Sequence, residues 1–249
     1  MLAEERRKQI VERLTRKGQV LAADLVREFN VSEDTIRRDL KELADAGALK
    51  KVHGGAVIST TVPYDYSARS AANVASKDKI ARRAVDLVDD GMLIFVDGGT
   101  TTAQIANHLQ ADLRATFITY SLATAKALSV LRRADILLLG GRLVSDLLIT
   151  TGPESIEQSK QFRPALSIVG VHGITVADGC TVENYDDAMI KREFIRNSAD
   201  VAVLAGQEKL GFVASYLVAD VADVSYLICD APEDRLQPFA DSGVTVWRV

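Results

Sequence analysis

Seven short apolar runs, separated by amphipathic stretches, follow residue 91 of this 249-residue chain. The runs are 92–97, 115–119, 135–140, 166–170, 201–205, 226–230 and 244–247. Consecutive residues in each run are apolar, so a strand built from one would be buried on both faces. Strands of that kind, alternating with helices, are typical of a parallel sheet covered on both sides. We therefore expect a larger, mainly parallel α/β domain.

The overall composition agrees with a globular protein. Hydrophobic residues make up 47% of the chain and charged residues 26%. No run of about 18 apolar residues is present, and no apolar signal core follows the charged N-terminus, so we expect a cytoplasmic protein without a membrane partner. Cys180 and Cys229 lie far apart, and no cluster of His, Cys and carboxylates has metal-ligand spacing. We expect buried thiols, no metal site and no cofactor.

The first 57 residues show the periodicity of three helices. Ile10 and Leu14 lie four residues apart among charged residues, which predicts an amphipathic helix over 3–17. A second short helix is predicted by the four-residue spacing of Leu21, Leu25 and Phe29.

The third helix has the features of a DNA recognition helix. Ser32 is placed to cap it, and Ile36, Leu40 and Leu43 form its apolar stripe. Polar side chains away from that stripe are those of Thr35, Arg37, Arg38 and Lys41. A recognition helix needs such residues, because threonine contacts base edges in the major groove, arginine bonds guanine, and other cations hold phosphates.

Residues 49–57 predict two short strands around Gly54 and Gly55, which we interpret as a wing. Lys50, Lys51 and His53 would then lie along the nucleic-acid backbone. From periodicity alone, a three-helix interaction module with solvated arginines remains an alternative.

The charge of −4 is unevenly distributed along the chain. Residues 1–57 carry 12 Lys and Arg against 10 Asp and Glu, whereas residues 58–249 carry 18 against 24. Because phosphate contact depends on local cations, an acidic total does not exclude DNA binding. A polar stretch breaks the apolar periodicity at 58–76, so we expect a DNA-binding domain at 1–57, a linker at 58–76 and an α/β domain at 77–249.

The residues directly after the first apolar run are the strongest candidates for ligand contact. They are Asp97, Gly98, Gly99, Thr100, Thr101 and Thr102, followed by a helix expected to begin near Ala103. Glycines let the backbone approach an anion, threonine hydroxyls donate to it, and a helix N-terminus offers free N–H groups. This pattern indicates a phosphate cradle, and a simple tight turn is the equally weighted alternative.

Ligands of parallel sheets lie beyond the carboxyl ends of the strands, so other strand ends add candidates. These are Thr119, Tyr120, Ser121, Gly140, Gly141, Arg142 and Lys209. The acidic residues Glu183, Asp186 and Asp187 are candidate partners for sugar hydroxyls, with a solvated helix start as the commoner alternative. His172 also follows a strand, and a local hydrogen bond is its expected role. Arg69, in the linker segment, is a candidate for coupling the domains, with an exposed salt bridge as the alternative.

Residues 9–57, with VSEDTIRRDL and the downstream HGGA, resemble the DNA-binding part of the DeoR family of transcriptional regulators. The resemblance implies a winged helix-turn-helix that binds double-stranded operator DNA, with Ser32, Thr35, Arg37 and Arg38 at the contact positions.

The rest of the chain resembles the sensor domain of the same family through VDGGTTT, ITYSLATAKAL, LLLGGRL, GPESIE and LAGQEKLG. The resemblance implies a fold similar to ribose-5-phosphate isomerase and glucosamine-phosphate deaminase, and a phosphorylated sugar or polyol effector. The positions carried over are Asp97, Gly99, Thr100, Thr101, Ser121, Gly140, Gly141 and Lys209. Tyr120, Gly206 and Glu208 depart from the family's TNS and DxSK patterns and leave the effector's identity open. The segment 161–198 looks nearest to the glycerol-3-phosphate-responsive branch.

Two functions are compared on this basis. The first is a ligand-responsive regulator, a repressor in most of the family, acting as a homo-oligomer (dimer or tetramer) on a palindromic operator. The alternative is a sugar-phosphate isomerase or deaminase with an accessory N-terminal domain, using Asp97 or Glu183 as general base. The sequence shows no paired acid and base at recognisable spacing, which favours the regulator and a protein that is not an enzyme.

Overall fold

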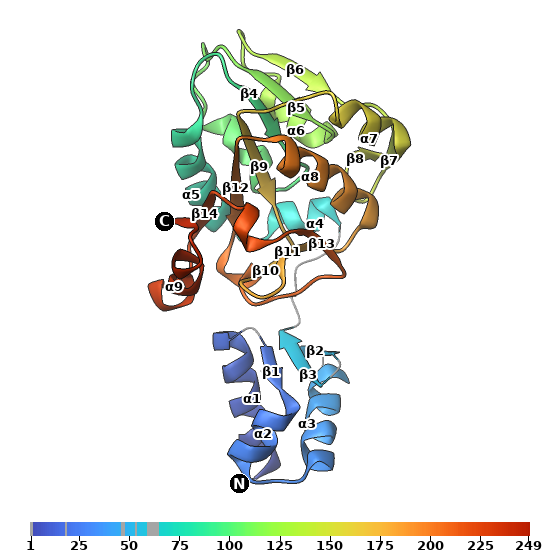
Figure 1. The fold of residues 1–249 in the computed structure, drawn as a ribbon, viewed down its shortest axis with the longest axis vertical. Coiled ribbons are helices and arrows are strands. Elements are labelled where there is room, and N and C mark those ends of the chain that lie inside the picture. The colour runs from blue at the N-terminus through green and yellow to red at the C-terminus, as the bar shows by residue number, and fades with distance from the viewer. Residues whose placement is uncertain (1, 18, 46–47, 53, 59–64) are drawn as a thin grey trace.

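The computed structural model describes residues 2–17, 19–45, 48–52, 54–58 and 65–249. The N-terminal head contains α1 (Ala3–Lys17), α2 (Ala22–Phe29) and α3 (Glu33–Asp45), together with three short strands (Figure 1). The strands are β1 (Gln19–Leu21), β2 (Leu49–Val52) and β3 (Gly55–Ile58), and they pair antiparallel in the order β1-β3-β2. The predicted winged helix-turn-helix is confirmed in this arrangement.

The head has its own hydrophobic core. Ile10 of α1, Leu25 of α2, and Ile36 and Leu40 of α3 are buried together. The three helices therefore pack through the apolar stripes that the sequence predicts. Leu21 differs from the prediction: it belongs to β1 and is 54% exposed, because the chain pairs with β3 before α2 begins.

All seven apolar runs form one parallel sheet, which confirms the α/β fold class. Its strands are β4 (Leu93–Val96), β5 (Thr116–Thr119), β6 (Asp135–Leu138), β9 (Leu166–Gly170), β12 (Asp200–Ala205), β14 (Tyr226–Cys229) and β15 (Thr245–Arg248). The order is β15-β14-β12-β9-β4-β5-β6, and every neighbouring pair is parallel. The chain starts at β4, extends to β6 on one side and then returns to β9 on the other. The strand order therefore reverses between β4 and β9.

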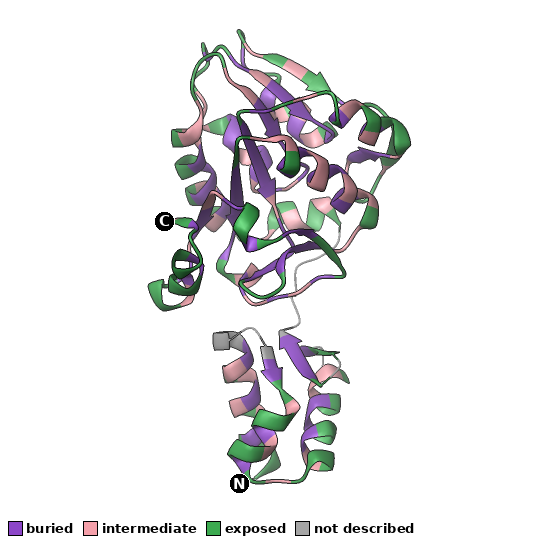
Figure 2. Cartoon of the chain, in the orientation of Figure 1, coloured by how far each residue is buried: buried purple, intermediate pink, exposed green. Residues whose placement is uncertain are grey.

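Helices cover both faces of this sheet, and its central strands are almost wholly buried (Figure 2). On one face α5 (Val74–Ala84), the 3₁₀ helix η2 (Thr102–Asn107) and α6 (Leu122–Leu128) pack against a core that includes Ile94. On the other face lie α7 (Pro153–Ser159), α8 (Tyr185–Asn197) and α9 (Glu233–Asp241). There the rings of Phe95 and Phe194 stack with their centroids 3.7 Å apart. The helix expected near Ala103 is the 3₁₀ helix η2.

The remaining elements are short. They are α4 (Tyr66–Ala71), β7 (Arg142–Val144), β8 (Ile149–Thr151), β10 (Gly173–Thr175), β11 (Gly179–Val182), β13 (Tyr216–Ala219), and the 3₁₀ helices η1 (Val85–Leu87), η3 (Gln207–Lys209) and η4 (Val221–Asp223). Strands β10, β11 and β13 form a small antiparallel sheet, and β7 pairs with β8. The helix α4 and the start of α5 fall inside the segment 58–76 that the sequence assigns to a linker. Among the described residues, no helix is long and apolar enough to cross a membrane.

Candidate functional site

Ser32 directly precedes α3 and is exposed. Its Oγ accepts a hydrogen bond from the Thr35 N–H at 3.2 Å, so the predicted cap is present. The hydroxyl oxygens of Ser32 and Thr35 lie 2.8 Å apart and hydrogen-bond each other. Both side chains would have to exchange this bond for one to a DNA group.

The three cations predicted on α3 are exposed, and they differ in their surroundings. Arg37 pairs with Glu33 of the same helix at 2.7 Å. Arg38 and Lys41 have no ion-pair partner within the part of the chain that the structure describes. Arg38 is therefore the arginine of this helix that is free to bind an anion or a base edge.

The predicted wing is the β2–β3 hairpin. Lys50 and Lys51 are both exposed on β2, and as successive strand residues they point to opposite faces. Lys51 shares its face with the buried Leu49, so only one of the two lysines can lie along a given side of a DNA backbone. His53 lies outside the described residues.

A second site is a cavity of about 380 Å³ where β4, β9 and β12 end. This is the point at which the strand order reverses, the usual ligand position in an open parallel sheet. We call it the switch-point cavity; its lining is Arg69, Ala72, Asn73, Ser76, Lys77, Gly98, Gly99, Thr100, Thr101, Leu147, Ile149, Gly170, Val171, His172, Asp187, Lys191, Leu204, Gly206, Glu208 and Lys209. Its volume lies in the range of small-molecule sites, which is roughly 300 to 1,000 Å³.

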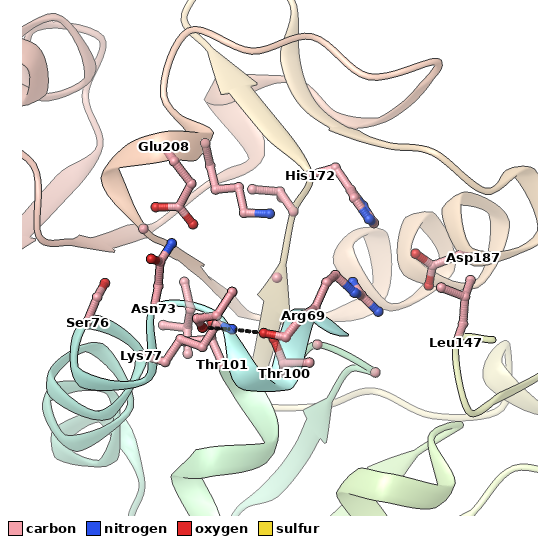
Figure 3. A pocket seen from close by; sticks show the side chains of 18 of the residues that line it. Arg69, Asn73, Ser76, Lys77, Thr100, Thr101, Leu147, His172, Asp187 and Glu208 are labelled. Atoms are coloured by element: carbon pink, nitrogen blue, oxygen red, sulfur yellow. Dashed lines mark hydrogen bonds between the residues drawn. The ribbon is translucent and has the colours of Figure 1, made fainter. Parts of the chain in front are cut away.

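The cavity contains polar atoms that lack partners. Among the described residues, the buried side-chain atoms without a hydrogen bond are Arg69 Nε, Ser76 Oγ, and Nδ1 and Nε2 of His172. All of them belong to residues that line the cavity (Figure 3). His172 is only 6% exposed, and burial, with the charge of Lys209 next, lowers its pKa to about 2. The local hydrogen bond expected for His172 is therefore wrong, and its ring is a neutral donor and acceptor facing the cavity.

Four cationic side chains face this space, those of Arg69, Lys77, Lys191 and Lys209. Burial, together with the charges of Arg69, Lys77 and Lys191, lowers the pKa of Lys209 to about 8, while Glu208 opposes the shift. Burial also lowers the pKa of Lys77. The cations therefore repel one another, and the carboxylates of Asp187 and Glu208 in the same lining offset part of this repulsion. Glu208 lines the same cavity, where its negative charge opposes the binding of an anionic ligand.

Five of the predicted effector contacts line the cavity: Gly98, Gly99, Thr100, Thr101 and Lys209. The hydroxyls of Thr100 and Thr101 make no hydrogen bond to any described residue, so they are free to donate to a ligand. A side chain at Gly98 would place its Cβ 2.5 Å from Ile149, which shows that packing also requires this glycine. Of the acidic residues, Asp187 lines the cavity, whereas Glu183 and Asp186 do not.

Other predicted contacts lie outside the cavity lining, for identifiable reasons. Asp97 and Thr102 bond each other beneath the loop, at 2.5 Å between Oδ1 and Oγ1. Thr119, Tyr120 and Ser121 are fully buried, and the Tyr120 hydroxyl donates to Asp187.

The tight connection from β6 to β7 contains Gly140 and Gly141. Gly141 has φ +145°, and a Cβ there would meet Ser155 of α7 at 2.3 Å. Arg142 pairs with Asp186 at the surface, and Glu183 accepts a hydrogen bond from Ser215. Neither carboxylate proposed as a general base, Asp97 or Glu183, therefore lines the cavity.

Sequence reasoning missed the contribution of α4 and α5. Arg69, Asn73, Ser76 and Lys77 enter the cavity from the segment assigned to a linker. The spacing of Ile80 and Ala84 indicates a helix there. No local pattern shows that the start of this helix turns toward the ends of β4 and β12.

Comparisons with known proteins cover both parts of the chain. Residues 6–62 match the DeoR-like helix-turn-helix domain, and residues 72–231 match the DeoR C terminal sensor domain. The HTH-type transcriptional repressor GlcR of Bacillus subtilis is 33% identical over 92% of this chain and 89% of its own length. The glycerol-3-phosphate regulon repressor of Escherichia coli is 33% identical over 92% of this chain and 91% of its own. Ribose 5-phosphate isomerase A of Methanocaldococcus jannaschii overlaps 56% of this chain and 55% of its own, with 19% identity and a TM-score of 0.39.

Proposed function

Because this chain belongs to the DeoR family of helix-turn-helix transcriptional regulators, we propose that it is an operator-binding repressor whose DNA affinity is set by a phosphorylated sugar or polyol in the switch-point cavity. The observation that carries the effector site is the set of unpartnered buried atoms on Arg69, Ser76 and His172. Buried polar groups without partners are costly, and a ligand with several hydroxyl and phosphate oxygens supplies those partners.

The phosphate group of the effector binds beside Thr100 and Thr101. The backbone of Gly98 and Gly99 and two free hydroxyls line this part of the cavity, and Lys77 lies next to it in Figure 3. Charge-assisted hydrogen bonds of this kind suit a group that carries roughly −1.5 to −2 at neutral pH.

The hydroxylated part of the effector lies toward His172 and Asp187, which border another part of the cavity (Figure 3). A neutral imidazole donates one hydrogen bond and accepts another, and a carboxylate accepts. Hydroxyl groups satisfy both demands, whereas a second phosphate there would meet the Asp187 carboxylate.

The N-terminal head binds the operator through α3 and the wing. Arg38 reads a base edge in the major groove, with Thr35 and Lys41 beside it, and Lys50 holds the phosphate backbone. Two heads of a homodimer, with α3 helices about 34 Å apart, match a palindromic operator in the cytoplasm. The effector changes operator affinity only as far as it binds one arrangement of the protein more tightly than the other.

A gel-shift titration tests this function. DNA from upstream of the protein's own gene is titrated with the protein alone and with inorganic phosphate, sn-glycerol 3-phosphate, glucose 6-phosphate and fructose 1-phosphate. We expect saturable, salt-dependent binding to one fragment and a change in affinity with one phosphate ester.

Two variants identify the effector site in the same titration. Lys209→Gln removes a cation from the cavity and raises the ester concentration needed for the response. Arg142→Gln removes a cation that the sequence predicted but that lies outside the cavity, and leaves the response unchanged. Binding to every fragment with equal affinity would refute the operator-binding function. A response lost with Arg142→Gln but not with Lys209→Gln would refute the placement of the effector.

A further inference from the structure

The helix α4 is the first described element after the segment that joins the head to the sheet domain. It has six residues, and none of them is buried. A helix of this length is not stable alone, so contacts with the rest of the domain must hold it. Elements held by few apolar contacts lie at the low-stability end of a structure, where ligands can change their equilibrium.

Hydrogen bonds hold α4 at both of its ends. Asp65 caps its first turn by accepting from the backbone N–H groups of Ser67 and Ala68. The Tyr66 N–H donates to the carbonyl of Asp146 at 2.7 Å. At the other end the Lys77 ammonium donates to the carbonyl oxygens of Arg69 and Ala72. Lys77 lines the cavity as well, so the C-terminus of α4 is fixed by a side chain of the effector site.

Arg69 connects α4 to the cavity directly. Its guanidinium points into the cavity, toward the side bordered by His172 and Asp187 (Figure 3). Its Nε is buried and unpartnered, and its charge lowers the pKa values of Lys77, Lys209 and His172. Within the described residues Arg69 has no carboxylate partner, and its Cζ lies 5.9 Å from the centroid of the Tyr66 ring. The exposed salt bridge considered from the sequence is absent from this part of the chain.

The charges around Arg69 determine whether an anion in the cavity favours or opposes the observed position of α4. In this cavity Arg69 faces Lys77, Lys191 and Lys209, and these like charges raise the free energy of keeping Arg69 there. The carboxylates of Asp187 and Glu208 offset part of this effect. A bound phosphate dianion reverses this repulsion into attraction. The position of α4 that the structure shows is therefore favoured by an anion in the cavity.

We propose that Arg69 is the effector-reading residue: its guanidinium pairs with the anionic group of the ligand and thereby fixes α4, which passes occupancy of the cavity to the head. This inference rests on the proposed function, because it needs a phosphorylated ligand in the cavity. It goes beyond that function by assigning the coupling to one side chain and one helix. Arg69 differs from Lys209, which lines the cavity from η3 and, among the described residues, makes no hydrogen bond or ion pair with α4.

The experiment compares Arg69→Gln and Lys209→Gln in the full-length chain. The probe is the ester among sn-glycerol 3-phosphate, glucose 6-phosphate and fructose 1-phosphate that changes operator affinity most in the wild type. For each protein, ester binding is measured by calorimetry, and operator affinity is measured without the ester and at its saturation. Hydrogen exchange of residues 65–72 is followed in both conditions.

Both variants bind the ester more weakly, and their response at saturation separates them. In the wild type and in Lys209→Gln, saturating ester changes operator affinity by about tenfold or more, within the usual range of allosteric coupling. In Arg69→Gln the change falls below about twofold. The ester slows exchange of residues 65–72 in the wild type and in Lys209→Gln, but not in Arg69→Gln.

Two outcomes overturn the proposal and are distinguishable from each other. A full response and full protection of α4 in saturated Arg69→Gln would show that Arg69 only contributes affinity, and the proposed function would stand. If the wild type binds none of the esters, the proposed function fails and the coupling through Arg69 fails with it.

Discussion

The Nζ atom of Lys191 lies 2.8 Å from Oδ2 of Asp97, an ion pair that joins α8 to the carboxyl end of β4. Both side chains are buried. Asp97 also accepts from the backbone N–H groups of Gly99 and Gly170, and Lys191 donates to the Gly170 carbonyl. The pair thus fixes the loops after β4 and β9, between which the switch-point cavity lies. Asp97 positions these loops from beneath and does not line the cavity.

We expect Asp97→Asn to lower the free energy of unfolding by about 3 kcal/mol, because breaking a buried pair leaves Lys191 without its nearest counter-charge. Chemical denaturation of the sheet domain, followed by circular dichroism, measures this change. Asp186→Asn is the control, since it breaks an exposed pair with Arg142 at 2.8 Å, and such pairs contribute about 1 kcal/mol or less. Equal losses in the two variants would contradict the structural role assigned to Asp97.

The sequence predicted the sheet well because all seven strands are apolar on consecutive positions, and short runs of that kind between amphipathic stretches favour buried parallel strands. It failed at Leu21, where pairing with β3 outweighs a four-residue spacing that also suits a helix. Thr100 and Lys209 could be found because they follow strands. Arg69, considered from the sequence only for coupling the domains, and Lys77 could not be assigned to the cavity. Both reach it from helices that precede the first strand of the large sheet, and their approach depends on tertiary packing. The expectation for His172 failed because no local pattern reveals a ring without partners.

His172 predicts a fall in stability at acid pH. Its pKa in the folded protein is about 2, against an ordinary value of 6.5, so below pH 6.5 the unfolded chain takes up a proton that the folded chain does not. Stability present above pH 6.5 is lost progressively as the pH falls toward about 2. Between pH 7 and pH 5 we expect the wild type to lose on the order of 2 kcal/mol more than His172→Gln. Urea unfolding of both proteins at the two pH values measures this difference, and parallel losses would show that His172 protonates in the folded state.

Lys209 predicts weaker effector binding at alkaline pH. Its pKa is about 8, and a bound phosphate favours the charged form, so above pH 8 binding must include uptake of a proton. A phosphate ester is fully ionised well below this pH, so the ligand adds no titration of its own. We expect affinity to fall about tenfold from pH 7 to pH 9 in the wild type and far less in Lys209→Arg. Calorimetric titration at the two pH values measures this, and an equal fall in Lys209→Arg would assign the titration to another group, such as Lys77.

Arg38 and Lys50 predict two different effects on DNA binding. Arg38 is exposed on α3 without an ion-pair partner among the described residues, so we expect Arg38→Ala to weaken operator binding by about tenfold to a hundredfold and to reduce the preference for operator over random DNA. Lys50→Ala should weaken binding to both kinds of DNA alike and lower the salt dependence by about one unit of slope. Arg27→Ala is the control, because this exposed arginine of α2 pairs with Asp24 and lies outside α3 and the wing. Affinities measured at several salt concentrations separate these effects. Equal losses on operator and random DNA with Arg38→Ala would show that Arg38 holds a phosphate and that another residue of α3 reads the sequence.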